Sequence, residues 1–280
     1  MSDCETEISG GGSVSVGAAR VALVCQLIAS RFPRLDEISV LDLASDEGAF
    51  SRELAQQGAE VVSIEGREAS HQRAREIRDD ENLDRWTTYC ADVIEVDLAE
   101  HGPYDVVLCL GFLYHLRAGD AVRLLRRIAA VCSGITIVET QISTESVTAE
   151  FIGERSYHGR PYREDPVHDG DALAAYDSFW FTGRSLLDAF ADAGFGLVTE
   201  VQSPRPHLLN RYRDHGWWVL TPAREIPEWS RALLGGTLLE PNPPATGAEL
   251  VHPANASRRR RRAMQSSLET VLFGSFPPSS

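Results

Sequence analysis

The chain has 280 residues, a formal net charge of −14, and no lysine, so all 27 of its Lys and Arg residues are arginines. The lack of lysine excludes Schiff-base enzymes, Walker A nucleotide-binding proteins and protein kinases, because each of these needs a lysine amine. The acidic balance argues against a general nucleic-acid binder, which needs a basic face. A hydrophobic content of 43% is ordinary for a globular protein, and the length predicts either one large domain or one domain with an appendage.

The first 16 residues are polar and glycine-rich, which predicts a flexible N-terminal arm. The sequence begins MSDCETE and lacks the apolar run of a signal peptide. It also lacks a stretch of about 18 apolar residues, so no membrane span is predicted. An odd number of cysteines without a CxxC pair favours reduced core residues in a cytoplasmic protein. They are Cys4, Cys25, Cys90, Cys109 and Cys132.

Residues 17–32 carry apolar side chains at helical spacing, and short apolar runs then alternate with amphipathic segments as far as residue 139. The runs, at 39–44, 60–65, 86–91, 104–110 and 135–139, predict strands, and the segments 49–57, 69–79 and 119–131 predict helices. Continuous apolar strands are buried on both faces. The alternation therefore predicts a parallel sheet with helices on both sides.

Residues 142–181 interrupt this rhythm, since they are rich in aromatic and charged side chains without a clean period. Residues 182–195 then predict a helix, with Thr182 or Ser185 as N-cap and Gly194 near its end. Two closing strands are predicted at 196–202 and 216–222, so the main domain is expected to span 17–222. The remainder, 223–280, is predicted to be a peripheral tail, in which Leu268, Val271, Leu272 and Phe273 could form a short docked helix.

The segment VLDLASDEGAFSRELAQQGAEVVSIEGRE (40–68) contains the sharpest motif. A strand ends at Asp42, a turn of small residues follows, and the next strand ends at Glu65. The spacing puts two carboxylates and a helix N-terminus at the carboxyl ends of neighbouring parallel strands, where open α/β sheets bind ligands. An acid about 20 residues beyond such a turn is suited to the two hydroxyls of a ribose.

In this arrangement the chain resembles a class I S-adenosylmethionine-dependent methyltransferase over about residues 18–222. VLDLASDEG resembles the family's first motif, SIEGRE its ribose acid, CADV its adenine motif and YDVVLCLGFLYHL its fourth motif, while ITIVET and AGF followed by LVTEV match its last elements. The resemblance implies a doubly wound, mostly parallel seven-stranded sheet with helices on both faces, a substrate-capping insertion at 142–181 and a peripheral tail. It implies S-adenosylmethionine as cofactor, S-adenosylhomocysteine as product, and cofactor contacts from Asp42, Ala44, Ser45, Asp46, Gly48, Phe50, Glu65, Gly66, Arg67, Ala91, Asp92, Val93, Leu110 and Gly111.

Two glycines of the family's first motif are replaced here, by Ala44 and Asp46. Asp46 could accept a hydrogen bond from the amino group of the cofactor, or it could cap the following helix. If Asp46 blocked the pocket, the protein would be a relic of the family that no longer binds the cofactor. The acids Asp46 and Glu47 argue against a nicotinamide dinucleotide, because they would repel its pyrophosphate, whereas a sulfonium cation suits them.

Two histidines are candidate bases for the acceptor: His115 after the fourth strand and His158 in the insertion. Either can instead have a structural role. Candidate substrate-binding residues are Tyr114, Glu139, Gln141, Tyr157, Tyr162 and Trp180. His158, His168 and Asp169 fit no standard metal motif, so no metal is expected.

These features predict methyl transfer to a small-molecule acceptor, with O-methylation of a specialised metabolite as the first expectation. Three alternatives stay open: a non-methylating step such as ring closure, a tRNA-modifying enzyme, which the fourth motif and residues 178–195 also resemble, and a non-catalytic binding protein. The run Arg258–Arg262 favours a solvated tail or an intramolecular partner for acids over RNA contact, and no membrane partner is expected.

Overall fold

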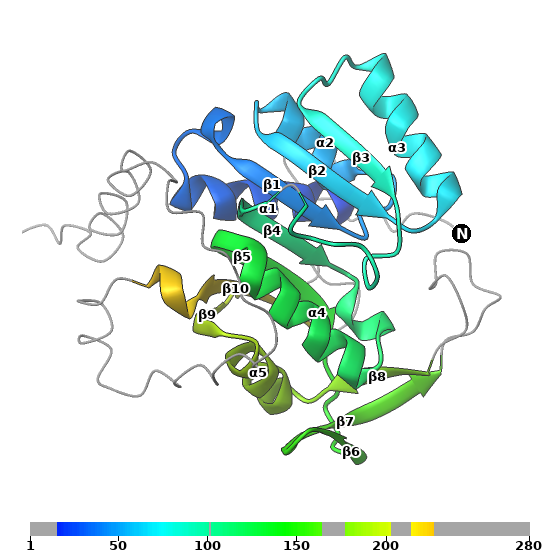
Figure 1. Cartoon of the computed structure of the whole chain (residues 1–280), viewed down its shortest axis with the longest axis vertical. Coiled ribbons are helices and arrows are strands. Elements are labelled where there is room, and N and C mark those ends of the chain that lie inside the picture. The colour runs from blue at the N-terminus through cyan, green and yellow to red at the C-terminus, as the bar shows by residue number, and fades with distance from the viewer. Residues whose placement is uncertain (1–15, 101, 164–176, 203–213, 227–280) are drawn as a thin grey trace, which may run out of the picture.

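A computed structural model of the chain describes residues 16–100, 102–163, 177–202 and 214–226. Its centre is a seven-stranded sheet in the order β3-β2-β1-β4-β5-β10-β9 (Figure 1). The strands are β1 (Ser39–Leu43), β2 (Glu60–Glu65), β3 (Trp86–Cys90), β4 (Tyr104–Leu110), β5 (Cys132–Gln141), β9 (Phe195–Glu200) and β10 (His215–Pro222). The first five run parallel, and β10 is antiparallel to both β5 and β9. The predicted mostly parallel seven-stranded sheet is confirmed.

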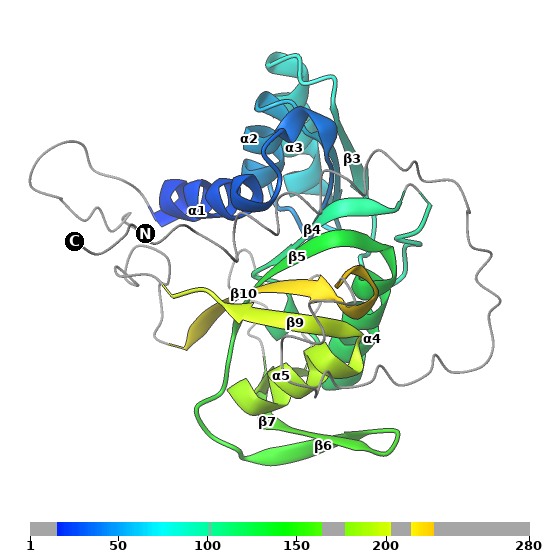
Figure 2. The same cartoon turned by 90° about the vertical axis from the view of Figure 1, so that its left-hand side faces the viewer.

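Helices cover both faces of this sheet, as Figure 2 shows. One face carries α1 (Val16–Arg31), α2 (Ala49–Gln56) and α3 (Glu68–Asp80), and the other carries α4 (Ala118–Val131) and α5 (Gly183–Asp192). Short 3-10 helices occur in the connections: η1 (Leu35–Glu37), η2 (Leu113–His115) and η4 (Ala223–Glu225). Successive strand residues alternate between two apolar clusters. Val106 and Leu108 pack toward α1 and α2, whereas Val107 and Cys109 pack toward α4. This alternation explains why the strands read as continuous apolar runs.

The ends of α2 and α5 follow from local chemistry. Gly48 precedes α2 with a φ of 79°, and a Cβ at this position would lie 2.4 Å from the indole ring of Trp86, so only glycine fits. Thr182 caps α5, its hydroxyl oxygen accepting a hydrogen bond from the Ser185 backbone N–H at 3.3 Å. Gly194, with a φ of 101°, lies just beyond the end of α5. The sequence therefore predicts both ends of α5 correctly, with Thr182 as its N-cap and Gly194 just after its last turn.

The insertion after β5 has more structure than its irregular sequence predicts. It forms a three-stranded antiparallel sheet from β6 (Thr148–Ile152), β7 (Arg155–Arg163) and β8 (Asp177–Phe181). One face of this sheet packs into the apolar cluster of α4 and α5 through Tyr157, Phe179 and Phe181. The even-numbered residues of β7 point the other way, so the period of two is real but is masked by charged residues on both faces.

The described residues extend to 226, four beyond the predicted domain boundary at 222. Arg224 in η4 donates hydrogen bonds to the backbone carbonyls of Ala129, Ala130 and Cys132. The predicted N-terminal arm up to residue 15, the predicted docked helix at 268–273 and the run Arg258–Arg262 lie outside the described residues. Among the helices that the structure describes, none is long and apolar enough to cross a membrane.

The prediction that the cysteines are core residues is correct for Cys109 and Cys132, which are buried. It is wrong for Cys90, which is exposed, and Cys25 is half-buried. All four are free thiols, and Cys4 lies outside the described residues. Cys90 escapes burial because it is the last residue of an edge strand, so that only one side of its strand is covered by a neighbour.

Candidate active site

The turn between β1 and α2 takes the shape that the replaced glycines would allow. Ala44 and Asp46 have positive φ values of 53° and 52°, in the left-handed region that glycine occupies most easily. The backbone of the family's glycine-rich turn is therefore kept although two side chains have been added. Within the turn, the hydroxyl oxygen of Ser45 is buried and has no hydrogen-bond partner among the described residues, which leaves a polar group for a ligand to satisfy.

Glu65, the predicted ribose acid, is buried at the end of β2, beside this turn. Its Oε2 accepts the backbone N–H of Asp46 at 2.8 Å, and its Oε1 accepts the backbone N–H and the Nε–H of Arg67 at 2.8 and 3.0 Å. Asp46 in turn accepts hydrogen bonds from Arg67 and from Ser70 of α3. Asp46 therefore joins the turn to α3, and the expectation that it caps α2 is wrong, because Gly48 occupies the N-cap position.

Asp42 lies fully buried at the end of β1, where its Oδ2 accepts a hydrogen bond from the Ser51 hydroxyl at 2.6 Å. Burial raises the pKa of this carboxyl to about 7, and the negative charge of Glu65 adds to the shift. Two neighbouring buried carboxyl groups attract a cation and repel phosphate groups. The acids beside the turn therefore fit a sulfonium compound and disfavour a pyrophosphate.

The predicted adenine side lies at the next strand end. The backbone N–H of Ala91 bonds to the carbonyl of Glu65, and Asp92 folds its own loop by accepting the backbone N–H of Ile94 at 2.8 Å. Val93 is buried beneath this loop. The first three motifs of the resemblance thus meet at the carboxyl ends of β1, β2 and β3, as expected for adjacent parallel strands.

A second group of polar residues meets at the carboxyl end of β5. The side chain of Glu139 is 1% exposed, and its Oε1 lies 2.6 Å from Nδ1 of His215 on β10. Its Oε2 accepts a hydrogen bond from Arg20 of α1 at 3.0 Å. Gly111, at the end of β4, closes the group, because its N–H bonds to the Glu139 carbonyl and a Cβ there would lie 3.4 Å from Oε2 of Glu139.

Aromatic rings surround this group. Tyr114 lies between three other rings, with centroid distances of 4.2 Å to His115, 5.8 Å to His215 and 6.5 Å to Trp180. Trp180 stacks on Tyr162 at 4.5 Å. The predicted residues Tyr114, Glu139, Tyr162 and Trp180 therefore belong to one continuous cluster of contacting side chains, which also includes the candidate base His115.

Two arginines lie over aromatic rings at the two ends of this cluster. The guanidinium of Arg160 lies 4.8 Å from the ring centroid of Trp180. That of Arg20 lies between Phe50 and Trp217, at 5.7 and 5.6 Å from their centroids. Phe50, which was predicted from the cofactor motif, thus connects the cofactor turn to the Glu139 group through Arg20.

Two predicted residues of the insertion lie elsewhere. Tyr157 is 1% exposed and belongs to the apolar core, where its hydroxyl donates to Asp192 of α5 at 2.8 Å and its ring packs on Phe181. The strand alternation places it on the face opposite Tyr162, so it has a packing role. His158 shares the face of Tyr162, and its Nδ1 contacts the Ser146 hydroxyl at 3.2 Å. Gln141 pairs in register with His215 at the start of β10.

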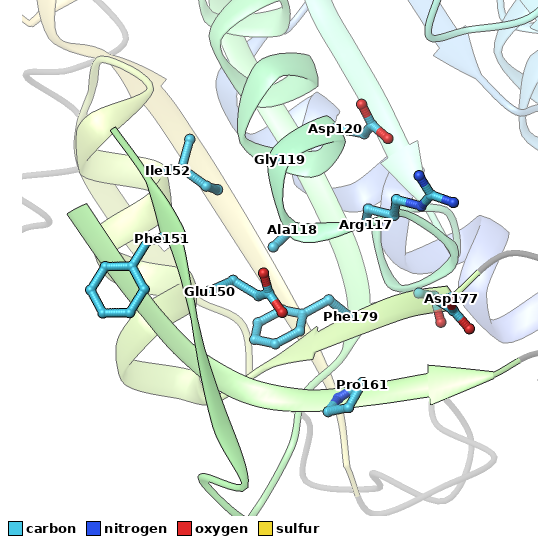
Figure 3. A pocket seen from close by; sticks show the side chains of 11 residues that line it. Arg117, Ala118, Gly119, Asp120, Glu150, Phe151, Ile152, Pro161, Asp177 and Phe179 are labelled. Atoms are coloured by element: carbon cyan, nitrogen blue, oxygen red, sulfur yellow. The ribbon is translucent and has the colours of Figure 1, made fainter. Parts of the chain in front are cut away.

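A cavity of about 450 Å³ lies between the start of α4 and the small sheet, lined by Arg117, Glu150, Phe151, Pro161, Asp177 and Phe179 among others (Figure 3). It contains none of the predicted site residues, and it lies on the face of the small sheet that packs toward α4, opposite Tyr162 and Trp180.

The sequence matches the methyltransferase domain family over residues 18–200. This chain belongs to that family. The N-terminal domain of EvdMO1, crystallised with S-adenosylhomocysteine, is similar at 26% identity and a TM-score of 0.59, covering 78% of this chain and 89% of that domain. A second structure of the same domain, in the presence of S-adenosylhomocysteine and D-fucose, gives 26% identity and a TM-score of 0.58 over 78% of this chain and 88% of the other.

A structure described as a putative O-methyltransferase from Nostoc punctiforme shares the fold at 22% identity and a TM-score of 0.50, over 72% of this chain and 56% of that one. Among curated proteins, the 23S rRNA (uracil(1939)-C(5))-methyltransferase RlmD of Shewanella halifaxensis is 38% identical over 93 residues. That match covers 33% of this chain and 20% of RlmD, so the chain spans only a small part of this relative.

The chain thus contains an S-adenosylmethionine-dependent methyltransferase domain of the class I fold, with S-adenosylmethionine as its cofactor. The buried acids and the orphaned Ser45 hydroxyl fit this cofactor, which would be held by the turn at 44–48, by Glu65 and by the loop at 91–93.

Sequence reasoning missed two residues of the site, His215 and Arg20. His215 is the first residue of HGWWVLTP, and only the antiparallel register of β10 on β5 brings it to Glu139. Arg20 is a single charge in an otherwise apolar helical stripe, a signal that is visible in the sequence but does not name its partner.

Proposed function

We propose that this methyltransferase modifies a hydroxyl group of a small, hydroxyl-rich metabolite such as a deoxy sugar, and that His215 accepts the hydroxyl proton. The observation that carries the proposal is the contact of 2.6 Å between Nδ1 of His215 and the buried carboxylate of Glu139. A histidine oriented by a carboxylate is a recurrent general base, because the carboxylate stabilises the imidazolium that forms.

S-adenosylmethionine supplies an electrophilic methyl group on a sulfonium. When bound, it would give this methyl group to the acceptor oxygen and keep the electron pair of the broken carbon–sulfur bond on sulfur, while Nε2 of His215 would take the hydroxyl proton. Glu139 keeps its charge throughout, with Arg20 as its second partner. Because Nε2 of His215 is buried, the acceptor has to displace the side chains that cover it, which would also exclude water from the reacting atoms.

The lining of the second group supports an acceptor with several hydroxyls. Trp180 Nε1 and Arg160 Nε are buried donors without a hydrogen-bond partner among the described residues, and hydroxyl oxygens would satisfy them. Tyr162 remains 41% exposed and offers a ring face to an apolar sugar face. The likeness to the EvdMO1 domain, whose structure was determined in the presence of D-fucose, supports the same class of acceptor.

His115 stays a candidate for the same role, since it stacks beside Tyr114 at the end of β4. His158 is a weaker candidate because its Nδ1 is engaged with Ser146 on the exposed face of the insertion. The contact of 2.6 Å between Nδ1 of His215 and the buried carboxylate of Glu139 favours His215 as the base.

The test uses the purified full chain with S-adenosylmethionine and a panel of D-fucose and other deoxyhexose derivatives, and detects methylated product by mass spectrometry. We expect transfer to at least one sugar, a loss of about 100-fold or more in turnover for His215→Gln, and a change of only a few-fold for His115→Gln. Binding of S-adenosylhomocysteine should be the same in both variants. Transfer to an rRNA or tRNA transcript instead of any sugar, or full turnover in His215→Gln, would overturn the proposal.

A further inference from the structure

Three side chains that can bind a metal lie together where the start of α3 meets the end of β3. Glu68 is the first residue of α3, His71 follows one turn later on the same helix face, and Cys90 is the last residue of β3. One ligand atom of each, a carboxylate oxygen, a ring nitrogen and the sulfur, lies within 4.8 Å of the other two. The methyl-transfer reaction proposed above uses none of them.

His71 is the member of this cluster that requires an explanation. It is only 7% exposed, and both of its ring nitrogens are buried without a hydrogen-bond partner among the described residues. A buried imidazole normally has a partner for at least one nitrogen, because leaving both unsatisfied costs the solvation of two polar atoms. Its ring is also directed at a thiol and a carboxylate, which are ligands for the same kind of ion.

The charge around the cluster favours a cation. Glu68 and Glu65 both place negative charge beside the Cys90 thiol. The guanidinium of Arg67, the residue before Glu68, is engaged with Glu65 and Asp46. A divalent ion would neutralise these acids and release the Cys90 proton to solvent.

We propose that Glu68, His71 and Cys90 bind one Zn²⁺ ion, with water as the fourth ligand, and that the ion joins α3 to β3. Thiolate, imidazole and carboxylate are the ligand types that zinc takes, and a sulfur ligand disfavours Mg²⁺ and Ca²⁺. Zinc bonds of about 2.0–2.3 Å put tetrahedral ligands about 3.3–3.8 Å apart, so small side-chain rotations are enough to complete the site. This replaces the expectation of no metal, which considered only His158 and His168.

The experiment titrates ZnCl2 into the full chain, purified without a histidine tag and treated with a chelator, with MgCl2 as the control ion. We expect one equivalent of Zn²⁺ to bind, a rise in the midpoint of thermal unfolding, and protection of Cys90 from alkylation, each absent with MgCl2. Co²⁺ in place of Zn²⁺ should give thiolate-to-cobalt charge-transfer absorption, which reports the sulfur ligand directly.

Variants separate this site from adventitious binding. Cys90→Ser and Glu68→Gln change exposed side chains and should fold, and each should weaken Zn²⁺ binding at least 10-fold. Cys25→Ser, which alters a half-buried cysteine on α1, should bind Zn²⁺ as the unaltered chain does. Equal binding in Cys90→Ser, or no binding at a 10-fold molar excess of Zn²⁺, would overturn the proposal.

Discussion

Oε1 of Glu139 lies 2.6 Å from Nδ1 of His215, and this contact joins the last parallel strand of the sheet to its antiparallel neighbour. The two residues are two register positions apart across β5 and β10, since Trp217 faces Glu139 and Gln141 faces His215. Both side chains therefore lie on one face of the sheet, at the edge where the cofactor turns also end.

Replacement of Glu139 by glutamine tests the role of this carboxylate. An amide cannot stabilise a protonated imidazole, so we expect Glu139→Gln to lower kcat by about 100-fold, within the usual range for acid–base groups. Affinity for S-adenosylhomocysteine, measured calorimetrically, should be unchanged. Arg20→Gln serves as the control, because it removes the other partner of Glu139 and keeps the contact to His215. A Glu139→Gln enzyme with normal kcat would show that the contact is structural.

Glu65 is expected to hold the cofactor through charge-assisted hydrogen bonds. Glu65→Gln should weaken S-adenosylhomocysteine binding by about 1.5–3 kcal/mol, roughly 10- to 100-fold. Glu60→Gln is the matched control, since Glu60 starts the same strand at the opposite, exposed end. The measurement is the dissociation constant by calorimetry. Equal affinity in the two variants would remove Glu65 from the cofactor site.

The positive φ of Ala44 predicts a strained turn. Ala44→Gly should relieve about 1–2 kcal/mol of backbone strain and lose part of it to the greater entropy of the unfolded chain, for a net gain of about 0.5–1 kcal/mol. Ala69→Gly, in the first turn of α3, should instead lower the free energy of unfolding. Urea titrations of both variants measure these changes. A loss of stability in Ala44→Gly would mean that the alanine methyl group makes contacts that outweigh the strain.

The raised pKa of Asp42 makes stability depend on pH. Its folded pKa of about 7 exceeds the unfolded value near 4, so the folded state holds a proton that the unfolded state has lost between these values. The contribution of Asp42 to the free energy of unfolding is therefore largest below pH 4 and is lost as the pH rises to 7. Asp42→Asn removes this dependence and keeps an oxygen acceptor for Ser51.

We expect Asp42→Asn to be more stable than the unaltered chain at pH 8, by an amount on the order of 2–4 kcal/mol, and the difference to shrink toward pH 5. Urea titrations at several pH values, without cofactor, give this difference directly. Parallel pH curves for the two proteins would contradict a raised pKa at this position.

The two faces of β7 predict opposite effects for its two tyrosines. Tyr157→Phe removes the hydrogen bond to Asp192 and should lower the free energy of unfolding by about 1 kcal/mol with no effect on the acceptor KM. Tyr162→Ala should raise the acceptor KM about 10-fold with little change in stability, because the ring is partly exposed and stacks on Trp180. An unchanged KM in Tyr162→Ala would place the acceptor away from the small sheet.

Most of the main sheet could be predicted from the sequence, because strands buried on both faces leave continuous apolar runs and their helices leave caps and stripes. The cofactor turns followed from acids at fixed intervals. The small sheet could not be predicted, since Arg155, Arg160 and Arg163 interrupt its apolar period. The pairing of Glu139 with His215 and the cluster at His71 depend on register between strands and on helix packing, which local sequence does not encode.

The alternation along β7 gives neighbouring residues of the insertion different roles. Odd-numbered positions anchor it, with Tyr157 hydrogen-bonded to Asp192 of α5, and even-numbered positions such as Arg160 and Tyr162 contact Trp180 at the proposed acceptor site. A change at position 158, 160 or 162 therefore leaves the anchoring side chains in place. Relatives of this enzyme could acquire new acceptors by exchanging every second residue of one strand, while the cofactor half of the domain and the attachment of the insertion evolve under separate constraints.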